Sequence, residues 1–118
     1  MIYGYARVSS AGQAIDGNSL EAQSELLKAN GAQKIFSDVY TGTKLHRPEL
    51  DKLMTEIHPG DTLIVAKLDR IARSVKGGIE IIDSLLAKDV SVNILNMGLM
   101  NNTSTGKLIR NVMLAFAE

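Results

Sequence analysis

The chain has 118 residues and no cysteine, so disulfide bonds and thiolate metal sites are excluded. Its two histidines, His46 and His58, do not have the spacing of metal ligands, and we expect neither a metal nor another cofactor. Net charge is absent as well, because 13 basic residues balance 13 acidic ones. A domain that binds nucleic acid through bulk charge is normally basic. Any such role must therefore rest on a local cluster, or on a part of the protein outside this chain.

Long apolar runs are also missing. No segment approaches the roughly 20 residues of a membrane-spanning helix, and Met1 leads directly into a predicted strand without a charged leader. We expect a soluble, cytoplasmic protein, and its length suits one domain with a single core.

Strand and helix patterns alternate along the chain. Residues typical of strands occupy segments 2–8, 34–39, 62–65 and 91–96. Helical patterns run from Ser19 to Ala29, from Pro48 to Ile57, from Val75 to Lys88, and from about Thr105 to the end. We expect a loop between Met97 and Ser104. This order predicts an α/β fold with a mainly parallel central sheet and helices on both faces.

A charged cluster follows the apolar strand 62–65, where a helix is about to begin. It contains Lys67, Asp69, Arg70 and Arg73. In open α/β sheets this edge is where ligands bind. Arg70 and Arg73 would share a face at the start of the next helix, and paired arginines there are unfavourable unless an anion compensates them. The cluster therefore favours an anion site; the alternative is a solvated turn with an Asp–Arg ion pair.

A serine follows an arginine at the end of the first predicted strand. Side chains alternate along a strand, so Arg7 and Ser9 would project to the same side. Alone, a serine after a strand is usually an ordinary loop residue or a helix cap. Beside an arginine it becomes a candidate nucleophile toward a phosphate group.

Three segments, in the same order along the chain, resemble the serine site-specific recombinases, a family of resolvases, invertases and integrases. They are Tyr3-Gly4-Tyr5-Ala6-Arg7-Val8-Ser9-Ser10, then Tyr40-Thr41-Gly42 with Arg47-Pro48, then Lys67-Leu68-Asp69-Arg70-Ile71-Ala72-Arg73-Ser74. The resemblance covers the whole chain and is to the N-terminal catalytic domain of that family. It implies a resolvase-like fold.

The resemblance also implies a reaction. Ser9 would attack a DNA phosphodiester to give a 5′-phosphoserine link and a free 3′-hydroxyl, followed by strand exchange and religation. Arg7, Arg70 and Arg73 would hold the scissile phosphate, and Asp69 would position Arg70 or relay a proton. Further positions that match the lining of the same site are Gln13, Gln23, Thr41, Arg47 and Lys67. Guanidinium groups, rather than a metal, would stabilise the charge that builds on the phosphoryl oxygens.

The family's organisation implies that residues 1–118 are the catalytic domain, with a final helix from about residue 104 that is truncated at Glu118. The DNA-binding domain would lie outside this chain, so we expect the fragment to be inactive or weakly active. The implied partners are a double-stranded recombination site, a second copy in a homodimer, and a tetramer in the full-length synaptic complex. The stretch from Ala14 to Asn18 resembles the longer loop of large integrases. Resolvase, invertase, integrase and transposase activities all stay open.

The last predicted helix is apolar nearly all round, more than one docked face requires. We predict that it packs against a second copy through Ile109, Val112, Met113 and Phe116. The alternative is burial between its own sheet and segment 97–100. Two other functions also stay open: a flavodoxin-like module without covalent chemistry, and a recombinase fragment that only dimerises.

Overall fold

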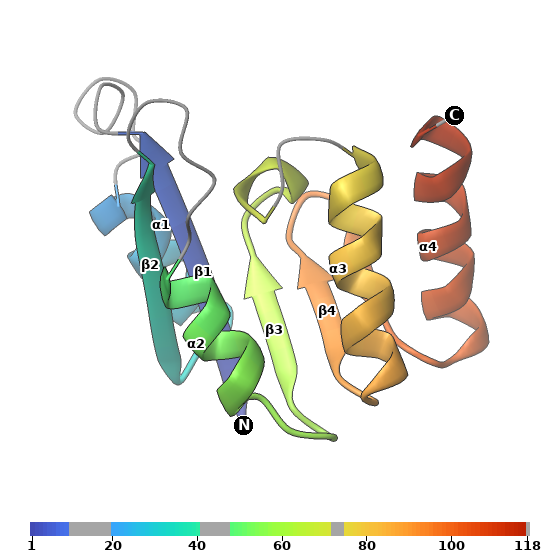
Figure 1. Cartoon of the computed structure of the whole chain (residues 1–118), viewed down its shortest axis with the longest axis horizontal. Coiled ribbons are helices and arrows are strands. Elements are labelled where there is room, and N and C mark those ends of the chain that lie inside the picture. Colours follow the sequence, from blue (N-terminus) through green and yellow to red (C-terminus); the bar gives the residue numbers. More distant parts are fainter. Residues whose placement is uncertain (10–19, 41–47, 72–74, 118) are drawn as a thin grey trace.

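The computed structural model of the chain describes residues 1–9, 20–40, 48–71 and 75–117 (Figure 1). Its elements in chain order are β1 (Ile2–Ser9), α1 (Leu20–Ala29), β2 (Lys34–Tyr40), α2 (Pro48–Glu56), β3 (Thr62–Val65), the short 3-10 helix η1 (Leu68–Arg70), α3 (Val75–Ala87), β4 (Ser91–Ile94), β5 (Gly98–Met100) and α4 (Ser104–Ala117). None of the helices in these ranges is long and apolar enough to cross a membrane.

The strands form one sheet in the order β2-β1-β3-β4-β5. β1 pairs in parallel with both β2 and β3, β3 pairs in parallel with β4, and β5 pairs antiparallel with β4. Helices α2 and α3 cover one face of the sheet and α1 covers the other, as Figure 1 shows. The predicted α/β fold, with a mainly parallel sheet and helices on both faces, is confirmed.

The alternation of side chains along β1 divides the interior into two cores. Tyr3 and Tyr5 face the larger core under α2 and α3, whereas Ala6 faces a smaller core under α1 that also contains Leu27 and Ile64. Other strand residues in the larger core are Phe36, Leu63, Val65, Val92 and Ile94, and its helix residues include Leu50, Leu53, Ile79, Ile82 and Leu85. This period of two follows from strand geometry.

Close packing of α1 on the sheet depends on Gly4. A Cβ atom at this position would lie 3.2 Å from Leu27 Cδ1 and 3.1 Å from the Cβ atom of Ala32. Both distances are shorter than ordinary van der Waals contact. The glycine therefore lets α1 and the segment after it approach β1.

The expectation of a loop from Met97 to Ser104 is wrong in part, because residues 98–100 form the edge strand β5. After β4 the main chain turns back, with Met97 N donating to Ile94 O at 2.8 Å. Gly98 has φ of +134°, a conformation that favours glycine. The side chain of Met100 is fully buried in the larger core. That burial explains why this segment is more apolar than an ordinary exposed loop.

Candidate active site at the carboxyl edge of the sheet

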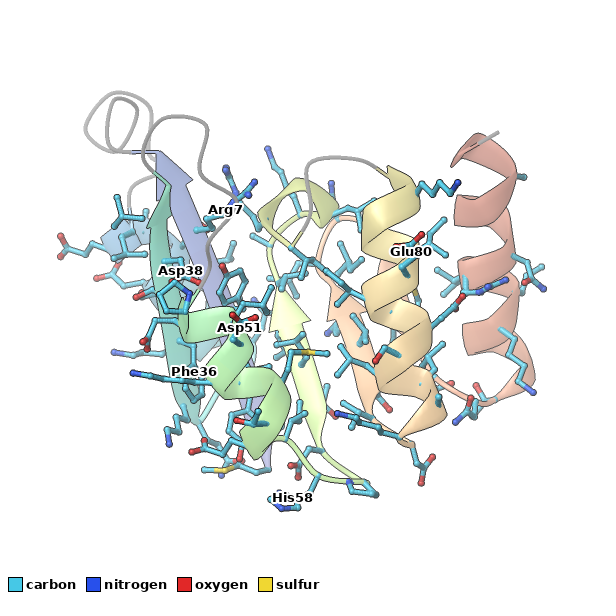
Figure 2. All side chains as sticks on the ribbon, viewed as in Figure 1. Arg7, Phe36, Asp38, Asp51, His58 and Glu80 are labelled. Atoms are coloured by element: carbon cyan, nitrogen blue, oxygen red, sulfur yellow. The ribbon has the colours of Figure 1, made fainter. Side chains whose placement is uncertain are left out.

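The parallel strands bring the predicted functional segments to one edge of the sheet. β1 ends at Ser9, and η1, which contains Asp69 and Arg70, follows the end of β3 and contacts β1. Figure 2 shows Arg7 at this edge, where β1 approaches η1. The side chains of Ser9 and Asp69 lie outside the described part of the chain. Four predicted site residues, Gln13, Thr41, Arg47 and Arg73, lie outside the described residues altogether.

The predicted placement of Arg70 on the first turn of the following helix is wrong. Arg70 lies in η1, whereas α3 begins only at Val75. The separate turn is held by its apolar neighbours, because Ile71 is fully buried and Leu68 packs against the larger core. A Cβ atom on Gly78 of α3 would lie only 2.6 Å from Leu68 Cδ1. The glycine thus leaves room for η1 to pack against α3.

Gln23, predicted to line the phosphate site, is buried and contacts the main chain of Arg7. The Arg7 N–H donates to Gln23 Oε1 at 3.3 Å, and Gln23 Nε2 donates to the Arg7 carbonyl oxygen at 3.1 Å. The β1–β3 pairing has its last pair at Tyr5 and Val65. Beyond that pair the amide of Gln23 takes the place of a neighbouring strand. Gln23 therefore fixes the segment of β1 that carries Arg7 and leads to Ser9.

Asp38 is a buried acidic residue that the sequence interpretation missed. It lies opposite Arg7 in the β1–β2 register and is only 6% exposed. Its carboxylate accepts hydrogen bonds from the Tyr5 hydroxyl at 2.8 Å and from the main-chain N–H groups of Glu49 and Leu50, both at 3.1 Å. Asp38 thus caps the first turn of α2 from a neighbouring strand. The available signal was a single acidic residue inside an otherwise strand-like segment, 34–39.

A cavity of about 280 Å³ lies between α1 and the carboxyl ends of β3 and β4. Its lining consists of Ala22, Gln23, Leu26, Ala66, Lys67, Arg70, Leu95 and Asn96. The charged side chains in this lining are those of Lys67 and Arg70, and no carboxylate is among them. Two cationic side chains therefore reach this cavity and could hold an anion there.

Arg7 and Arg70 approach this edge from different faces of the sheet. Alternation places Arg7 on the same face as Tyr5, under α2, whereas Arg70 lines the cavity beside α1. Within the described residues, no group of three or more His, Asp or Glu side chains lies close enough to hold a metal ion. The charged side chains described at this edge are those of Arg7, Lys67 and Arg70.

The four residues predicted for a subunit interface differ in their surroundings. Ile109 is half-buried against the larger core of its own domain. Val112 is 49% exposed, and Leu108 one turn before it is 61% exposed. The side chains of Met113 and Phe116 lie outside the described part of the chain. Leu108 and Val112 thus mark the exposed apolar face of α4.

The comparisons with known proteins give the family. The family model "Resolvase, N terminal domain" matches residues 2–118. The chain is 40% identical to the transposon Tn552 resolvase of Staphylococcus aureus over 120 residues, which is 100% of this chain and 58% of that protein. It is 34% identical to the serine recombinase gin of Escherichia phage Mu, covering 100% of this chain and 58% of that protein.

Solved structures show the same fold. The N-terminal catalytic domain of TP901-1 integrase matches with a TM-score of 0.76 at 27% identity, over 98% of this chain and 92% of that one. A resolvase family site-specific recombinase from Streptococcus pneumoniae matches with a TM-score of 0.72 at 26% identity, over 98% and 84% of the two chains. The fold is therefore that of serine recombinase catalytic domains. This chain belongs to the resolvase family, as its motifs predict, and it spans 58% of the length of the Tn552 resolvase.

Proposed function

We propose that this chain is the catalytic domain of a site-specific DNA recombinase and that Ser9 is its nucleophile. The observation that supports this most strongly is the convergence of two segments at one sheet edge. The end of β1, with Arg7 and Ser9, meets η1, with Asp69 and Arg70. A candidate nucleophile, cations for a phosphate group and a carboxylate thus come from strand ends that are far apart in sequence.

In the proposed reaction, the Ser9 oxygen attacks the phosphorus of a DNA phosphodiester and loses its proton. The bond from phosphorus to the 3′-oxygen breaks, and that oxygen leaves as a 3′-hydroxyl after it gains a proton. The phosphate is then esterified to Ser9 at the 5′ end of the other fragment. Attack by a 3′-hydroxyl of a partner strand reverses the step and frees the serine. The covalent link conserves the phosphodiester, so rejoining needs no separate energy source.

The described cations fit the electrostatic demand of this step. Negative charge on the non-bridging oxygens must be stabilised during in-line attack, and fixed guanidinium groups do this well. In our proposal Arg7 and Arg70 contact the phosphate from the two faces of the sheet, and Lys67 holds a neighbouring part of the DNA backbone. Asp69 orients Arg70 or relays a proton, and Gln23 holds the main chain of Arg7. Family resemblance assigns supporting roles in this site to Gln13, Thr41, Arg47 and Arg73.

We further propose that two copies of the chain associate through α4. The exposed positions of Leu108 and Val112, one helical turn apart, give that helix an apolar face directed away from its own core. A homodimer would cover this face, and a tetramer would form when two DNA sites are brought together in the full-length protein. DNA duplex recognition would rest on a region outside this chain.

The proposed nucleophile can be tested against its neighbouring serine. The chain is joined to the remaining part of the Tn552 resolvase, incubated with that protein's DNA site, and examined on a denaturing gel for protein-linked DNA. Wild type and the control Ser10→Ala should form the covalent complex, whereas Ser9→Ala should not. Peptide mapping should place the phosphate on Ser9. Covalent complex that persists in Ser9→Ala, or that never forms in wild type, would contradict the proposal.

A further inference from the structure

Arg110 is a charged residue of α4 that the proposed reaction does not use. Its guanidinium group forms two hydrogen bonds with the carboxylate of Asp83 on α3. Nε donates to Oδ1 at 2.8 Å, and Nη2 donates to Oδ2 at 2.6 Å. The hydrogen bond and the charge of Asp83 raise the pKa of Arg110 above its ordinary value. Figure 1 shows α4 running antiparallel to α3, so the pair joins the sides of two neighbouring helices.

Arg110 is also the last anchor of α4 among the described side chains. Gly106 packs so closely that a Cβ atom there would lie 2.4 Å from the main-chain nitrogen of Asn101. Ile109 approaches Gly98 of β5, where an added Cβ atom would lie 3.0 Å from Ile109 Cδ1. These contacts and Arg110 are spaced i, i+3 and i+4, which is one side of a helix.

Beyond this anchor the described side chains of α4 face solvent. Asn111, Val112 and Ala115 are all exposed. The helix continues to Ala117, about 10 Å past Arg110 at 1.5 Å per residue. The Asp83–Arg110 pair therefore lies between the part of α4 that its own domain holds and a part whose described side chains are exposed.

The chemistry of this contact allows it to open. A bidentate Arg–carboxylate pair fixes direction, because both donors of the planar fork must align with the acceptor. The pair is not sealed from water, since the side chain of Arg110 is 25% exposed and that of Asp83 is 43% exposed. Ion pairs at such exposure are screened by salt and are individually weak. The contact is thus specific in geometry and still reversible.

We propose that the Asp83–Arg110 pair is a latch that sets the direction of α4 on its own domain and so regulates association with a second copy of the chain. This inference rests on the proposed function in one respect, that the exposed face of α4 is the contact between copies. With the latch closed, α4 lies along α3 and Leu108 and Val112 project together from one direction. With the latch open, the helix from Arg110 onward can turn relative to α3, and the apolar face no longer keeps that direction.

Hydrogen exchange read by mass spectrometry tests the latch without DNA. In Asp83→Asn, which keeps the size of the side chain and removes its charge, peptides from residues 110–117 should exchange about tenfold faster. Peptides from β1, β3 and β4 should be unchanged. The control is Glu56→Gln, which disrupts the exposed Lys34–Glu56 pair, 2.8 Å apart. That change should leave α4 unaffected.

If Asp83→Asn does not fold, a second variant and a salt series still test the proposal. The charge exchange Asp83→Arg with Arg110→Asp should restore slow exchange in α4. In wild type, raising the salt concentration from about 0.05 M to about 1 M should speed exchange in α4 selectively. The proposal would be overturned if the rate of hydrogen exchange in α4 changed neither in Asp83→Asn nor with salt. It would also be overturned if exchange became equally faster across the whole domain.

Measuring self-association distinguishes the proposed regulatory role of the Asp83–Arg110 pair from the proposed dimer contact through α4. By analytical ultracentrifugation, Asp83→Asn should associate about tenfold more weakly than wild type, in step with its faster exchange in α4. Unchanged association in a variant with a loosened α4 would overturn the regulatory role. A wild type that stays monomeric would instead contradict the dimer contact, while the exchange data would still report on the pair itself.

Discussion

The side-chain amide of Gln23 is hydrogen-bonded to both the N–H and the C=O of Arg7, so a helix on one face of the sheet fixes the strand end that carries the candidate nucleophile. Gln23→Ala would remove both hydrogen bonds from the partly buried main chain of Arg7. We expect the free energy of unfolding to fall by about 1–3 kcal/mol and DNA cleavage to fall further, because Arg7 loses its support. Gln33→Ala, which removes one exposed hydrogen bond to Ile2, is the control. Urea unfolding measures the difference. Equal losses of unfolding free energy in the two variants would contradict the role of Gln23 in fixing the end of β1.

Arg70→Lys should impair catalysis while leaving the fold intact. Lysine keeps the positive charge but lacks the planar fork that holds two phosphate oxygens at once. We expect a loss on the order of 2–4 kcal/mol in transition-state stabilisation, by analogy with oxyanion donors. Single-turnover cleavage rates measure it, with Lys28→Arg on the outer side of α1 as a control that should cleave normally. Cleavage by Arg70→Lys at the wild-type rate would mean that charge alone matters here.

Asp38→Ala should destabilise the domain more than Tyr5→Phe does. The alanine variant leaves the Tyr5 hydroxyl and the N–H groups of Glu49 and Leu50 without their acceptor, so we expect a loss of about 2–4 kcal/mol. Tyr5→Phe removes one donor and leaves the helix cap in place, for a loss of about 1 kcal/mol. Thermal unfolding of both single variants and the double variant gives their coupling. Strictly additive effects would contradict the hydrogen bond between them.

Asp61 should make stability depend on acidic pH. The N–H of His58 and the ammonium group of Met1 both donate to its carboxylate, and these contacts lower the pKa of Asp61 from its ordinary value of 3.8. A depressed folded pKa stabilises the protein above the unfolded value, and the contribution is lost as the pH falls through the folded value. Asp61→Asn should therefore lower the free energy of unfolding by about 1–2 kcal/mol at pH 7, and the difference from wild type should shrink as the pH falls below 3.8 and through the lowered folded value. Urea unfolding across this range, with Asp89→Asn as an exposed control, distinguishes the two pH regimes.

Val112→Glu and Leu108→Lys should abolish self-association without unfolding the chain. Both side chains are largely exposed, so a charge there costs little in the isolated domain. We expect wild type to form a weak dimer that depends on concentration. Sedimentation of wild type and both variants tests this, with Leu26→Lys as a control at an exposed apolar position on α1. Association that survives both changes would place the contact elsewhere.

Much of the fold was predictable because the strands and helices have clear apolar patterns in the sequence. The runs around Tyr5 and Ile64 have the strand propensities of buried parallel strands, and the helices after Pro48 and before Lys88 show clear periodicity. β5 was not predictable in the same way. It has three residues, contains glycine and methionine rather than β-branched residues, and depends on the burial of Met100 in a core that forms only in the folded chain.

The candidate site was predictable in its residue types and only partly in its geometry. Strand order explains why the segments of Arg7 and Arg70 meet, since parallel strands end at one edge. The separate turn of η1 depends on how Ile71 and Leu68 pack, and no local pattern shows that. The role of Asp38 was hidden for the same reason, because its partners Tyr5 and Leu50 lie far from it in sequence.

The antiparallel direction of β5 has a consequence for whatever follows α4. A helix that connected two parallel strands would run away from the carboxyl edge, as α3 does. Because β5 returns the chain to the opposite edge first, α4 runs back toward the edge where β1, β3 and β4 end (Figure 1). Residues that continue beyond Ala117 in the same direction would emerge on the side of Arg7 and Arg70. A single short strand thus directs α4, and any segment that continued its course, toward the end of the domain that holds the candidate phosphate site.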